Sequence, residues 1–265
     1  MTRLQTVLQS EQQYLIPFIM SGDPSLEATR ELIHLLNEEG VAAIELGVPF
    51  SDPIADGPVI QAASERALRQ NVTLQDVLTL GRQVRQEGCQ VPLILFTYAN
   101  PVFQYGLSRV VEDAVGCGFD GLIVPDLPYE ESGELREWGQ KAGLSVIPLV
   151  APTSRQRIRQ IVEEAQGFVY CVSSLGTTGM RQQFAGTVDT FLQTVRELSP
   201  VPTAVGFGIS KREHVERFQK QADAVVVGSA LVRKIEELSG ALSDPVQRTE
   251  ALEQIRAFVT ALKTK

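Results

Sequence analysis

Residues 26–47 read LEATRELIHLLNEEGVAAIELG and contain one helical pattern followed by one apolar run. Apolar side chains recur at helical spacing as far as Glu39, glycine follows at position 40, and residues 42–47 are almost continuously apolar. Glycine adopts the left-handed conformation that often ends a helix, and continuously apolar strands are typical of parallel sheets covered by helices on both faces. The stretch therefore predicts one helix and one buried strand of an alternating β/α fold.

The same junction recurs along the chain, with Gly88, Gly143 and Gly167 each following a helical pattern and preceding an apolar run. The strands that we expect are 15–20, 42–47, 93–97, 121–124, 146–149, 168–172, 203–205 and 224–227. Among the helices that we expect are 26–39, 74–87, 129–142, 154–165, 188–198 and 211–221.

Eight such units in 265 residues, with no linker between them, favour one fold over its main alternative. A single (β/α)8 TIM barrel over residues 1–265 fits this number of units better than a doubly wound sheet does. An extra N-terminal helix at 4–12 and a last helix at 246–262 are expected to cover the ends of the barrel.

The composition excludes several classes of partner and location. The 32 Asp and Glu residues outnumber the 24 Lys and Arg residues, so the net charge of -8 argues against nucleic acid and against anionic membranes. The apolar runs are about half the ~20 residues that a membrane helix needs, and the N-terminus lacks a signal core. We therefore expect a cytoplasmic protein.

The residue types that are rare in this sequence exclude several kinds of catalytic and metal site. The only histidines, His34 and His214, both lie in helical patterns, which argues against catalytic triads and multi-histidine metal sites. The three cysteines share no CxxC spacing, so we predict small buried side chains in place of disulfides or zinc ligands. No lysine lies in an apolar run where it could form a Schiff base. Carboxylates are therefore expected to move the protons.

Glu45 is the anomaly in the second strand, because it is a carboxylate within an apolar run. Desolvation raises the pKa of such a group and suits it to general acid and base catalysis; a structural ion pair is the alternative. In the loop 49–58, Asp52 is interpreted as a turn residue and Asp56 as the second acid. A Mg²⁺ site on these acids is a weak alternative, since no further oxygen ligands have a suitable spacing, and we predict no metal.

Glycines follow the last two strands at the mouth of the predicted barrel. Gly206-Phe207-Gly208-Ile209-Ser210 and Gly228-Ser229 each precede a helix, where backbone N–H groups and the helix dipole attract an anion. Ser210 and Ser229 are predicted to cap these helices. The pair predicts a phosphate site, although each motif alone is also compatible with a simple tight turn.

Other strand ends supply candidate pocket residues. Tyr170 either donates a hydrogen bond to a substrate or fills the barrel interior, and we leave both interpretations open. The polar, glycine-bearing loop 173–181 is expected to be a lid over the barrel mouth. Apolar and aromatic side chains near the strand ends could line a pocket for a flat aromatic group: Phe18, Phe96, Tyr98, Ile123 and Phe207.

One long stretch carries a family resemblance. Residues 45–58, ELGVPFSDPIADGP, resemble the signature of the tryptophan synthase alpha subunit family. Shorter motifs follow in the family's order: Pro17-Phe18, Gly22-Asp23-Pro24, Tyr98-Ala99-Asn100-Pro101, Pro125-Asp126-Leu127-Pro128 and 206–210. The likeness spans the whole chain, but the lid reads SSLGTTG over 173–179, whereas the family pattern is close to S-x-T-G-V-T-G.

The resemblance implies a lyase of tryptophan biosynthesis that cleaves indole-3-glycerol phosphate to indole and glyceraldehyde 3-phosphate without a cofactor. It implies that Glu45 is the general acid and base, that Asp56 holds the indole N–H, and that Tyr170 orients both. Thr178 falls where the lid would close against the Asp56 loop. The residues implied to hold the phosphate are Gly179, Phe207, Gly208, Gly228 and Ser229.

The resemblance also implies a partner, a beta subunit that carries pyridoxal phosphate and assembles with the alpha subunit as an α2β2 heterotetramer. Residues similar to the family's contact surface are Pro53, Asn100, Phe103 and Pro128. Two other functions stay open at this stage. One is a phosphosugar isomerase of the histidine-pathway type, and the other is a barrel that mainly activates its partner and cleaves substrate weakly.

Overall fold

Nine parallel strands form one sheet in the computed structural model, which describes residues 2–8, 14–172, 185–206 and 208–263. The strand order is β5-β4-β3-β2-β1-β9-β8-β7-β6, so the two edge strands, β5 and β6, follow each other directly in the sequence. The strands are β1 (Tyr14–Met20), β2 (Ile44–Gly47), β3 (Leu93–Phe96), β4 (Gly121–Ile123), β5 (Ser145–Val146), β6 (Leu149–Val150), β7 (Val169–Val172), β8 (Thr203–Gly206) and β9 (Ala224–Val227).

The ring closes through the short segment that joins β5 to β6. The Ile147 amide donates to the Leu122 carbonyl at 2.9 Å on one side, and the Tyr170 amide donates to the Pro148 carbonyl at 3.0 Å on the other. The single strand predicted at 146–149 was therefore wrong in detail: it is two short strands, because Pro148 has no N–H to continue the ladder. The predicted (β/α)8 TIM barrel is otherwise confirmed.

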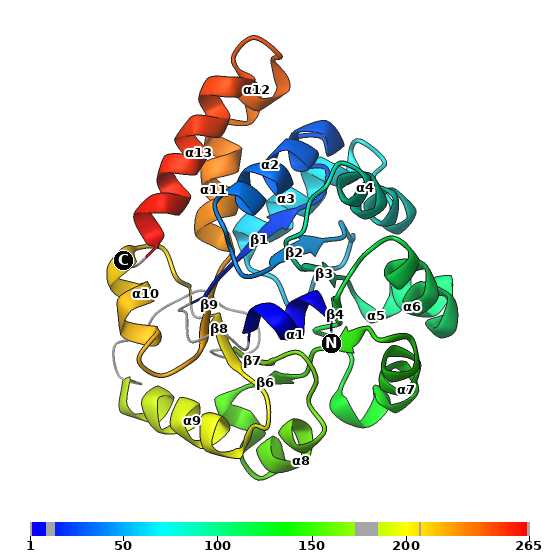
Figure 1. Cartoon of the computed structure of the whole chain (residues 1–265), viewed down its shortest axis with the longest axis vertical. Coiled ribbons are helices and arrows are strands. Elements are labelled where there is room, and N and C mark those ends of the chain that lie inside the picture. Colours follow the sequence, from blue (N-terminus) through cyan, green and yellow to red (C-terminus); the bar gives the residue numbers. More distant parts are fainter. Residues whose placement is uncertain (1, 9–13, 173–184, 207, 264–265) are drawn as a thin grey trace.

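Helices surround this ring, as Figure 1 shows. They are α1 (Arg3–Leu8), α2 (Leu26–Glu38), α3 (Pro58–Leu68), α4 (Leu74–Gln86), α5 (Ala99–Tyr105), α6 (Leu107–Gly116), α7 (Gly133–Ala142), α8 (Ile158–Glu163), α9 (Ala185–Leu198), α10 (Arg212–Phe218), α11 (Ser229–Glu237), α12 (Ser239–Ser243) and α13 (Arg248–Leu262). No helix in the described part of the chain is long and apolar enough to cross a membrane.

Several helices differ from the sequence-based expectation. The segments predicted at 129–142 and 154–165 each begin as a 3₁₀ helix, Tyr129–Glu131 and Pro152–Arg157, before α7 and α8. We did not predict α3, α5, α6 or α12; α3 begins with proline at its first position, where proline's missing N–H costs nothing. Of the predicted N-terminal helix at 4–12, residues 9–12 lie outside the described residues.

The barrel interior is closed at its amino end by α1. Leu4 and Leu8 of this helix are buried in the same apolar cluster as Ile16, Ile94 and Phe168 from three different strand regions. Figure 1 shows α1, in dark blue, across the centre of the ring of strands. Since the amino end is filled in this way, the open end that can receive a ligand is the carboxyl end of the strands.

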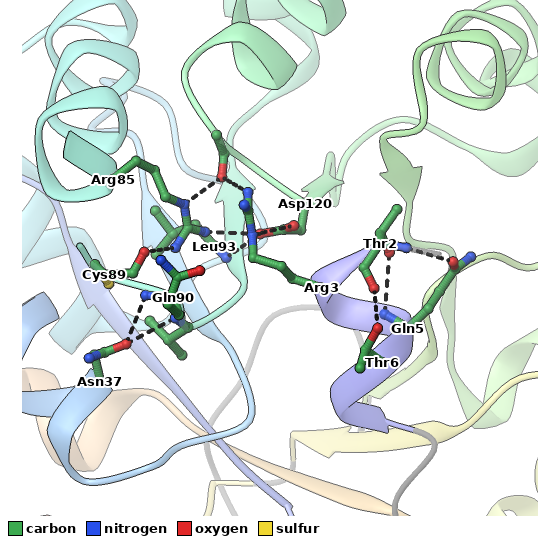
Figure 2. A network of polar contacts seen from close by, with 12 residues as sticks. Thr2, Arg3, Gln5, Thr6, Asn37, Arg85, Cys89, Gln90, Leu93 and Asp120 are labelled. Atoms are coloured by element: carbon green, nitrogen blue, oxygen red, sulfur yellow. Dashed lines mark hydrogen bonds and ion pairs between the residues drawn. The ribbon is translucent and has the colours of Figure 1, made fainter. Parts of the chain in front are cut away.

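A polar network fixes α1 to the barrel wall, as Figure 2 shows. Arg3 donates from Nε to Asp120 Oδ1 at 3.0 Å and from Nη2 to the Gly118 carbonyl at 2.9 Å. The other Asp120 oxygen accepts from Arg85 Nη2 at 3.0 Å and from the Leu93 amide at 3.1 Å. Asp120 is buried, so its charge is compensated by two arginines at this end of the barrel.

We expect Asp120→Ala to lower the free energy of unfolding by about 3 to 5 kcal/mol, because it leaves the largely buried Arg85 without its carboxylate. Urea unfolding followed by circular dichroism measures this loss. Glu137→Ala is the matched control, because its pair with Lys141 is exposed and is expected to contribute less than about 1 kcal/mol. Equal losses in the two variants would contradict a special role for the buried pair.

Candidate active site

Glu45 lies in β2, in register with Phe18 of β1 on one side and Ile94 of β3 on the other. Its side chain is 1% exposed, and neither carboxylate oxygen has a hydrogen-bond partner among the described residues. Burial without a compensating donor raises the pKa of Glu45 to about 8. The described residues therefore do not support the alternative of a structural ion pair, and Glu45 is neutral at pH 7.

Asp56 approaches from the loop between β2 and α3. The Asp56 amide donates to the Pro53 carbonyl at 3.1 Å, and the Gln61 side chain donates to the Asp56 carbonyl at 2.8 Å, which ties the turn to the first part of α3. The Tyr98 hydroxyl donates to Asp56 Oδ2 at 2.8 Å. Burial raises the pKa of Asp56 to about 6, and the bond from Tyr98 opposes that rise. Asp56 is thus mainly ionised at pH 7.

Asp52, in contrast, is exposed, and its carboxylate accepts a hydrogen bond from the neighbouring Ser51 hydroxyl. The predicted division between a turn residue at 52 and an inward acid at 56 agrees with this geometry. The described residues contain no group of three His, Cys, Asp or Glu side chains that could hold a metal ion, so the Mg²⁺ alternative has no ligand set within them.

Tyr170 of β7 interacts electrostatically with both acids. Burial raises the pKa of its hydroxyl, and the charges of Glu45 and Asp56 raise that pKa further, so both carboxyl groups are within electrostatic reach of the hydroxyl. The ring packs against Phe168 with centroids 6.2 Å apart. The hydroxyl lies against Gly206, where an added Cβ would approach it to 2.6 Å. Glycine at 206 is therefore what allows Tyr170 its position beside the acids.

Aromatic rings line the neighbouring strand ends. Phe18 and Phe96 pack edge to face with centroids 5.3 Å apart, and Phe18 Cζ lies 2.6 Å from the position of a Cβ at Gly47. Tyr98 stacks on Phe50 at 5.1 Å. Ile123 is fully buried in the interior cluster at the end of β4. Four of the predicted lining residues thus lie on β1, at the end of β3 and on β4, and Phe50 of the Asp56 loop, which was not predicted, packs against one of them.

The carboxyl ends of β8 and β9 carry the predicted anion cradle. Gly208 has a φ of +67° and open space where a Cβ would stand, and Gly228 is the N-cap of α11 with no side-chain cap. The first amides of α11 are therefore free of side-chain acceptors from its N-cap, as an anion site requires. The capping prediction was wrong in both cases: Lys211 is the N-cap of α10, and Ser229 is already the first residue of α11.

Three predicted substrate-binding residues, Thr178, Gly179 and Phe207, lie outside the described residues, as does the whole of the predicted lid at 173–181. Both histidines are placed as expected: His34 is bonded to Glu87 at 2.6 Å, and His214 contacts the Ser210 amide at 3.4 Å. All three cysteines are free and buried, which confirms the prediction of small buried side chains.

Two connections near the site were not predicted from the sequence. One is the bond from Tyr98 to Asp56, because Tyr98 was assigned only as a pocket ring. The other is Arg66 of α3, which forms two 2.8 Å bonds to buried Asp23 and a 2.6 Å bond to Glu236 of α11. Arg66 thus holds the helix that follows Asp56 against the helix that begins at Ser229. Both connections join residues far apart in sequence, so no local pattern signals them.

The chain matches the family model described as tryptophan synthase alpha chain over residues 4–263. Among curated proteins, the tryptophan synthase alpha chain of Halalkalibacterium halodurans is 49% identical over 262 residues, which cover 99% of each chain. The tryptophan synthase alpha chain of Bacillus subtilis is 49% identical over 258 residues, 96% of this chain and 95% of that one.

Solved structures agree with these relatives. Tryptophan synthase subunit alpha from Legionella pneumophila superposes with a TM-score of 0.87 at 36% identity, covering 99% of this chain and 97% of that chain. A structure from Pyrococcus furiosus, described as showing mutual activation of the tryptophan synthase a2b2 complex, has a TM-score of 0.84 at 36% identity. It covers 96% of this chain and 99% of the compared chain.

Proposed function

The chain belongs to the tryptophan synthase alpha chain family, and from that premise we propose that Glu45 and Asp56 carry its reaction. The chain is a lyase of tryptophan biosynthesis that cleaves indole-3-glycerol phosphate to indole and glyceraldehyde 3-phosphate. The observation that supports our assignment best is the pair of carboxyl groups with separated pKa values, about 8 for Glu45 and about 6 for Asp56. Near pH 7 one is an acid and the other an anion.

The proposed reaction follows from these two states. Neutral Glu45 donates its proton to indole C3, and ionised Asp56 accepts a hydrogen bond from the indole N–H and stabilises the positive charge that develops on the ring. The bond between C3 and the glycerol carbon then breaks with its electrons passing to the ring. The hydroxyl on that glycerol carbon becomes the aldehyde as it returns its proton to Glu45, so the enzyme ends in its starting state.

The remaining residues are assigned to binding. Tyr170, beside both acids, orients them and the substrate, which favours the first of its two interpretations. Phe18, Phe96 and Tyr98 are proposed to border the indole ring, with Ile123 beneath it. The phosphate is proposed to bind to backbone amides at Gly208, Gly228 and Ser229, and, from the family resemblance, at Gly179 and Phe207, with Thr178 closing over Asp56.

Acid–base chemistry of this kind is proposed to need no cofactor and no metal in this chain. We assign pyridoxal phosphate to a separate beta chain, which would consume the indole, in an α2β2 heterotetramer like the complex described for Pyrococcus furiosus. A cytoplasmic location is proposed because phosphorylated substrates do not cross membranes freely. The isomerase alternative finds no support, because the alpha chain family covers residues 4–263.

The pH dependence of cleavage tests the assignment. We expect kcat/KM for indole-3-glycerol phosphate to rise through a pKa near 6 as Asp56 ionises and to fall through a pKa near 8 as Glu45 loses its proton. Glyceraldehyde 3-phosphate release by the purified chain, measured from pH 5 to 9, gives the profile. Absence of release by the chain alone would favour the partner-activating alternative, and a profile without these two limbs would contradict the assigned roles.

The proposed docking surface consists of the 49–58 loop, helix α5 and the segment that follows β4, which leave the same barrel end. Phe103 of α5 is 55% exposed and Ile54 of the Asp56 loop is 75% exposed, so two large apolar side chains are available to a partner at this end of the barrel. Asn100 and Pro128 are also exposed, and Pro53 is partly buried. This surface and the site share the 49–58 loop, so a partner on it would lie next to Asp56.

We expect Phe103→Asp to weaken binding of the beta chain about 30-fold or more, because a charge replaces an apolar anchor in a buried interface. Isothermal titration calorimetry with a purified beta chain measures the change. Val115→Asp on α6 is the control, since Val115 is also exposed and apolar but lies outside the proposed surface. If both variants and the unaltered chain bound the beta chain equally well, Phe103 would not be part of the interface.

A further inference from the structure

Tyr98 occupies the junction between β3 and α5, where it is the N-cap residue of that helix. Its side chain is 2% exposed, although its hydroxyl lies at the barrel mouth beside the Asp56 loop. A buried phenol normally needs a hydrogen-bond partner, and here both capacities of the hydroxyl are used. The partners show what the hydroxyl does.

The hydroxyl donates to Asp56 Oδ2 at 2.8 Å and accepts from the Ala55 amide at 3.2 Å. A phenol has one proton, so the bond from Ala55 orients the lone pairs and directs that proton to Asp56. The ring stacks on Phe50, with centroids 5.1 Å apart and planes 27° apart. Tyr98 therefore fixes the loop at three residues, Phe50, Ala55 and Asp56.

From this geometry we propose that Tyr98 is a positioning residue for the lyase reaction: its hydroxyl holds one oxygen of Asp56 so that the other faces the indole N–H. This inference rests on the proposed role of Asp56. It assigns a specific function to Tyr98, which is otherwise proposed only to line the pocket. The bond to a charged acceptor also stabilises ionised Asp56 relative to its protonated form.

Other carboxyl groups near Tyr98 and Asp56 also influence the titration of the site and must stay unchanged in a test. Glu45 and Asp56 both act on the Tyr170 hydroxyl, and Asp126 acts on Tyr98 together with Asp56. Asp126 also accepts a hydrogen bond from the Ala99 amide at 2.8 Å, which fixes it beside the start of α5. Removing only the Tyr98 hydroxyl leaves all of these carboxyl groups in place. A shift in the acid limb of the pH profile, which is assigned to Asp56, would therefore be caused by the loss of the hydrogen bond from Tyr98.

The test is Tyr98→Phe, which keeps the ring that stacks on Phe50 and removes the hydroxyl. We expect the acid limb of kcat/KM for indole-3-glycerol phosphate to move upward by about one pH unit, with a several-fold loss of kcat at pH 8. The limb near pH 8 is expected to stay in place. A reduced rate with an unmoved acid limb would overturn the inference, because it would show that the hydroxyl does not act through Asp56.

Tyr105→Phe is the matched control. The Tyr105 hydroxyl also donates to a carboxylate, Asp113 Oδ2 at 2.6 Å, but Tyr105 and Asp113 belong to α5 and α6 outside the site. This variant is expected to keep both limbs and the rate. If Tyr105→Phe moved the acid limb as much as Tyr98→Phe does, the shift would be nonspecific and the inference would fall.

A second substitution covers the case in which Tyr98→Phe does not fold. Replacement of Tyr98 by 3-fluorotyrosine makes the phenol a stronger donor, so the acid limb is expected to move downward; an unmoved limb would overturn the inference. Failure of this inference is distinguishable from failure of the proposed function. An unaltered chain that cleaves substrate with no limb near pH 6 contradicts both, whereas a normal profile with no response to either change at Tyr98 contradicts only the inference.

Discussion

Glu45→Gln is expected to lower kcat for cleavage of indole-3-glycerol phosphate by about 1000-fold, within the 10² to 10⁴ range typical of general acid–base groups. Glutamine has nearly the same shape as the neutral acid but cannot donate a proton to indole C3 or take one from the glycerol hydroxyl. KM is expected to change little, because phosphate and ring contacts are separate from this group. A coupled assay for glyceraldehyde 3-phosphate measures both constants.

The matched control is Glu65→Gln on α3, because the Glu65 side chain is 71% exposed and, among the described residues, its ion pair is with the neighbouring Arg69 at 4.0 Å. It makes the same chemical change on the surface and is expected to retain full activity. Retention of more than a tenth of the activity by Glu45→Gln would rule out Glu45 as the principal proton donor. Loss of activity in both variants would point to a general effect of the substitution.

The same substitution has a consequence for stability, and its sign follows from the raised pKa. The folded protein keeps a proton on Glu45 between pH 4.5, the ordinary pKa of a glutamate, and about pH 8, whereas the unfolded chain has released it. The stability of the unaltered protein therefore falls as pH rises through that window and levels off above pH 8. Glutamine has no such loss, so we expect Glu45→Gln to be more stable near pH 8, by an amount on the order of a few kcal/mol.

The fold could be predicted because the patterns that indicate its strands and helices lie within short stretches of the sequence. Each strand is a short apolar run, and four helix–strand junctions carry a glycine, at positions 40, 88, 143 and 167, so these units of the barrel can be predicted from their own residues alone. The break at Pro148 was not predicted, although proline is visible in the sequence, because a strand tolerates proline where its N–H would be unpaired. Whether a particular backbone N–H of a strand must be paired depends on the two neighbouring strands. The closed barrel, and not the local sequence, determines which strands those are.

The two acids differ in how much of their role the sequence reveals. Glu45 is visible because a carboxylate within an apolar strand is energetically anomalous. Asp56 is one of two acids in a loop, and its choice over Asp52 rests on distance along the chain. Its link to Tyr98 was not predicted, since the two residues are 42 positions apart and meet only when β2 and β3 pair.

Asp56→Asn is expected to lower kcat about 100-fold, less than Glu45→Gln, because the amide oxygen can still accept the indole N–H but carries no charge. With its oxygen toward the indole, asparagine presents its NH2 group to the Tyr98 hydroxyl and can donate a hydrogen bond to it, so the loop is expected to hold its shape. The residual activity is expected to lack the limb near pH 6, since no group at 56 then titrates there.

The matched control for this change lies in the same loop. Asp52→Asn removes one carboxylate charge only four positions away, but Asp52 is exposed and bonded to Ser51, so rate and profile are expected to stay unchanged. Kinetics of all three proteins from pH 5 to 9 separate the possibilities. If Asp56→Asn kept the acid limb, another group would have to titrate there, and the charge that stabilises the indole ring would have to come from elsewhere in the barrel mouth. If the limb disappears while KM stays near its original value, the negative charge of Asp56 acts in the transition state and contributes little to substrate binding, as the proposed mechanism requires.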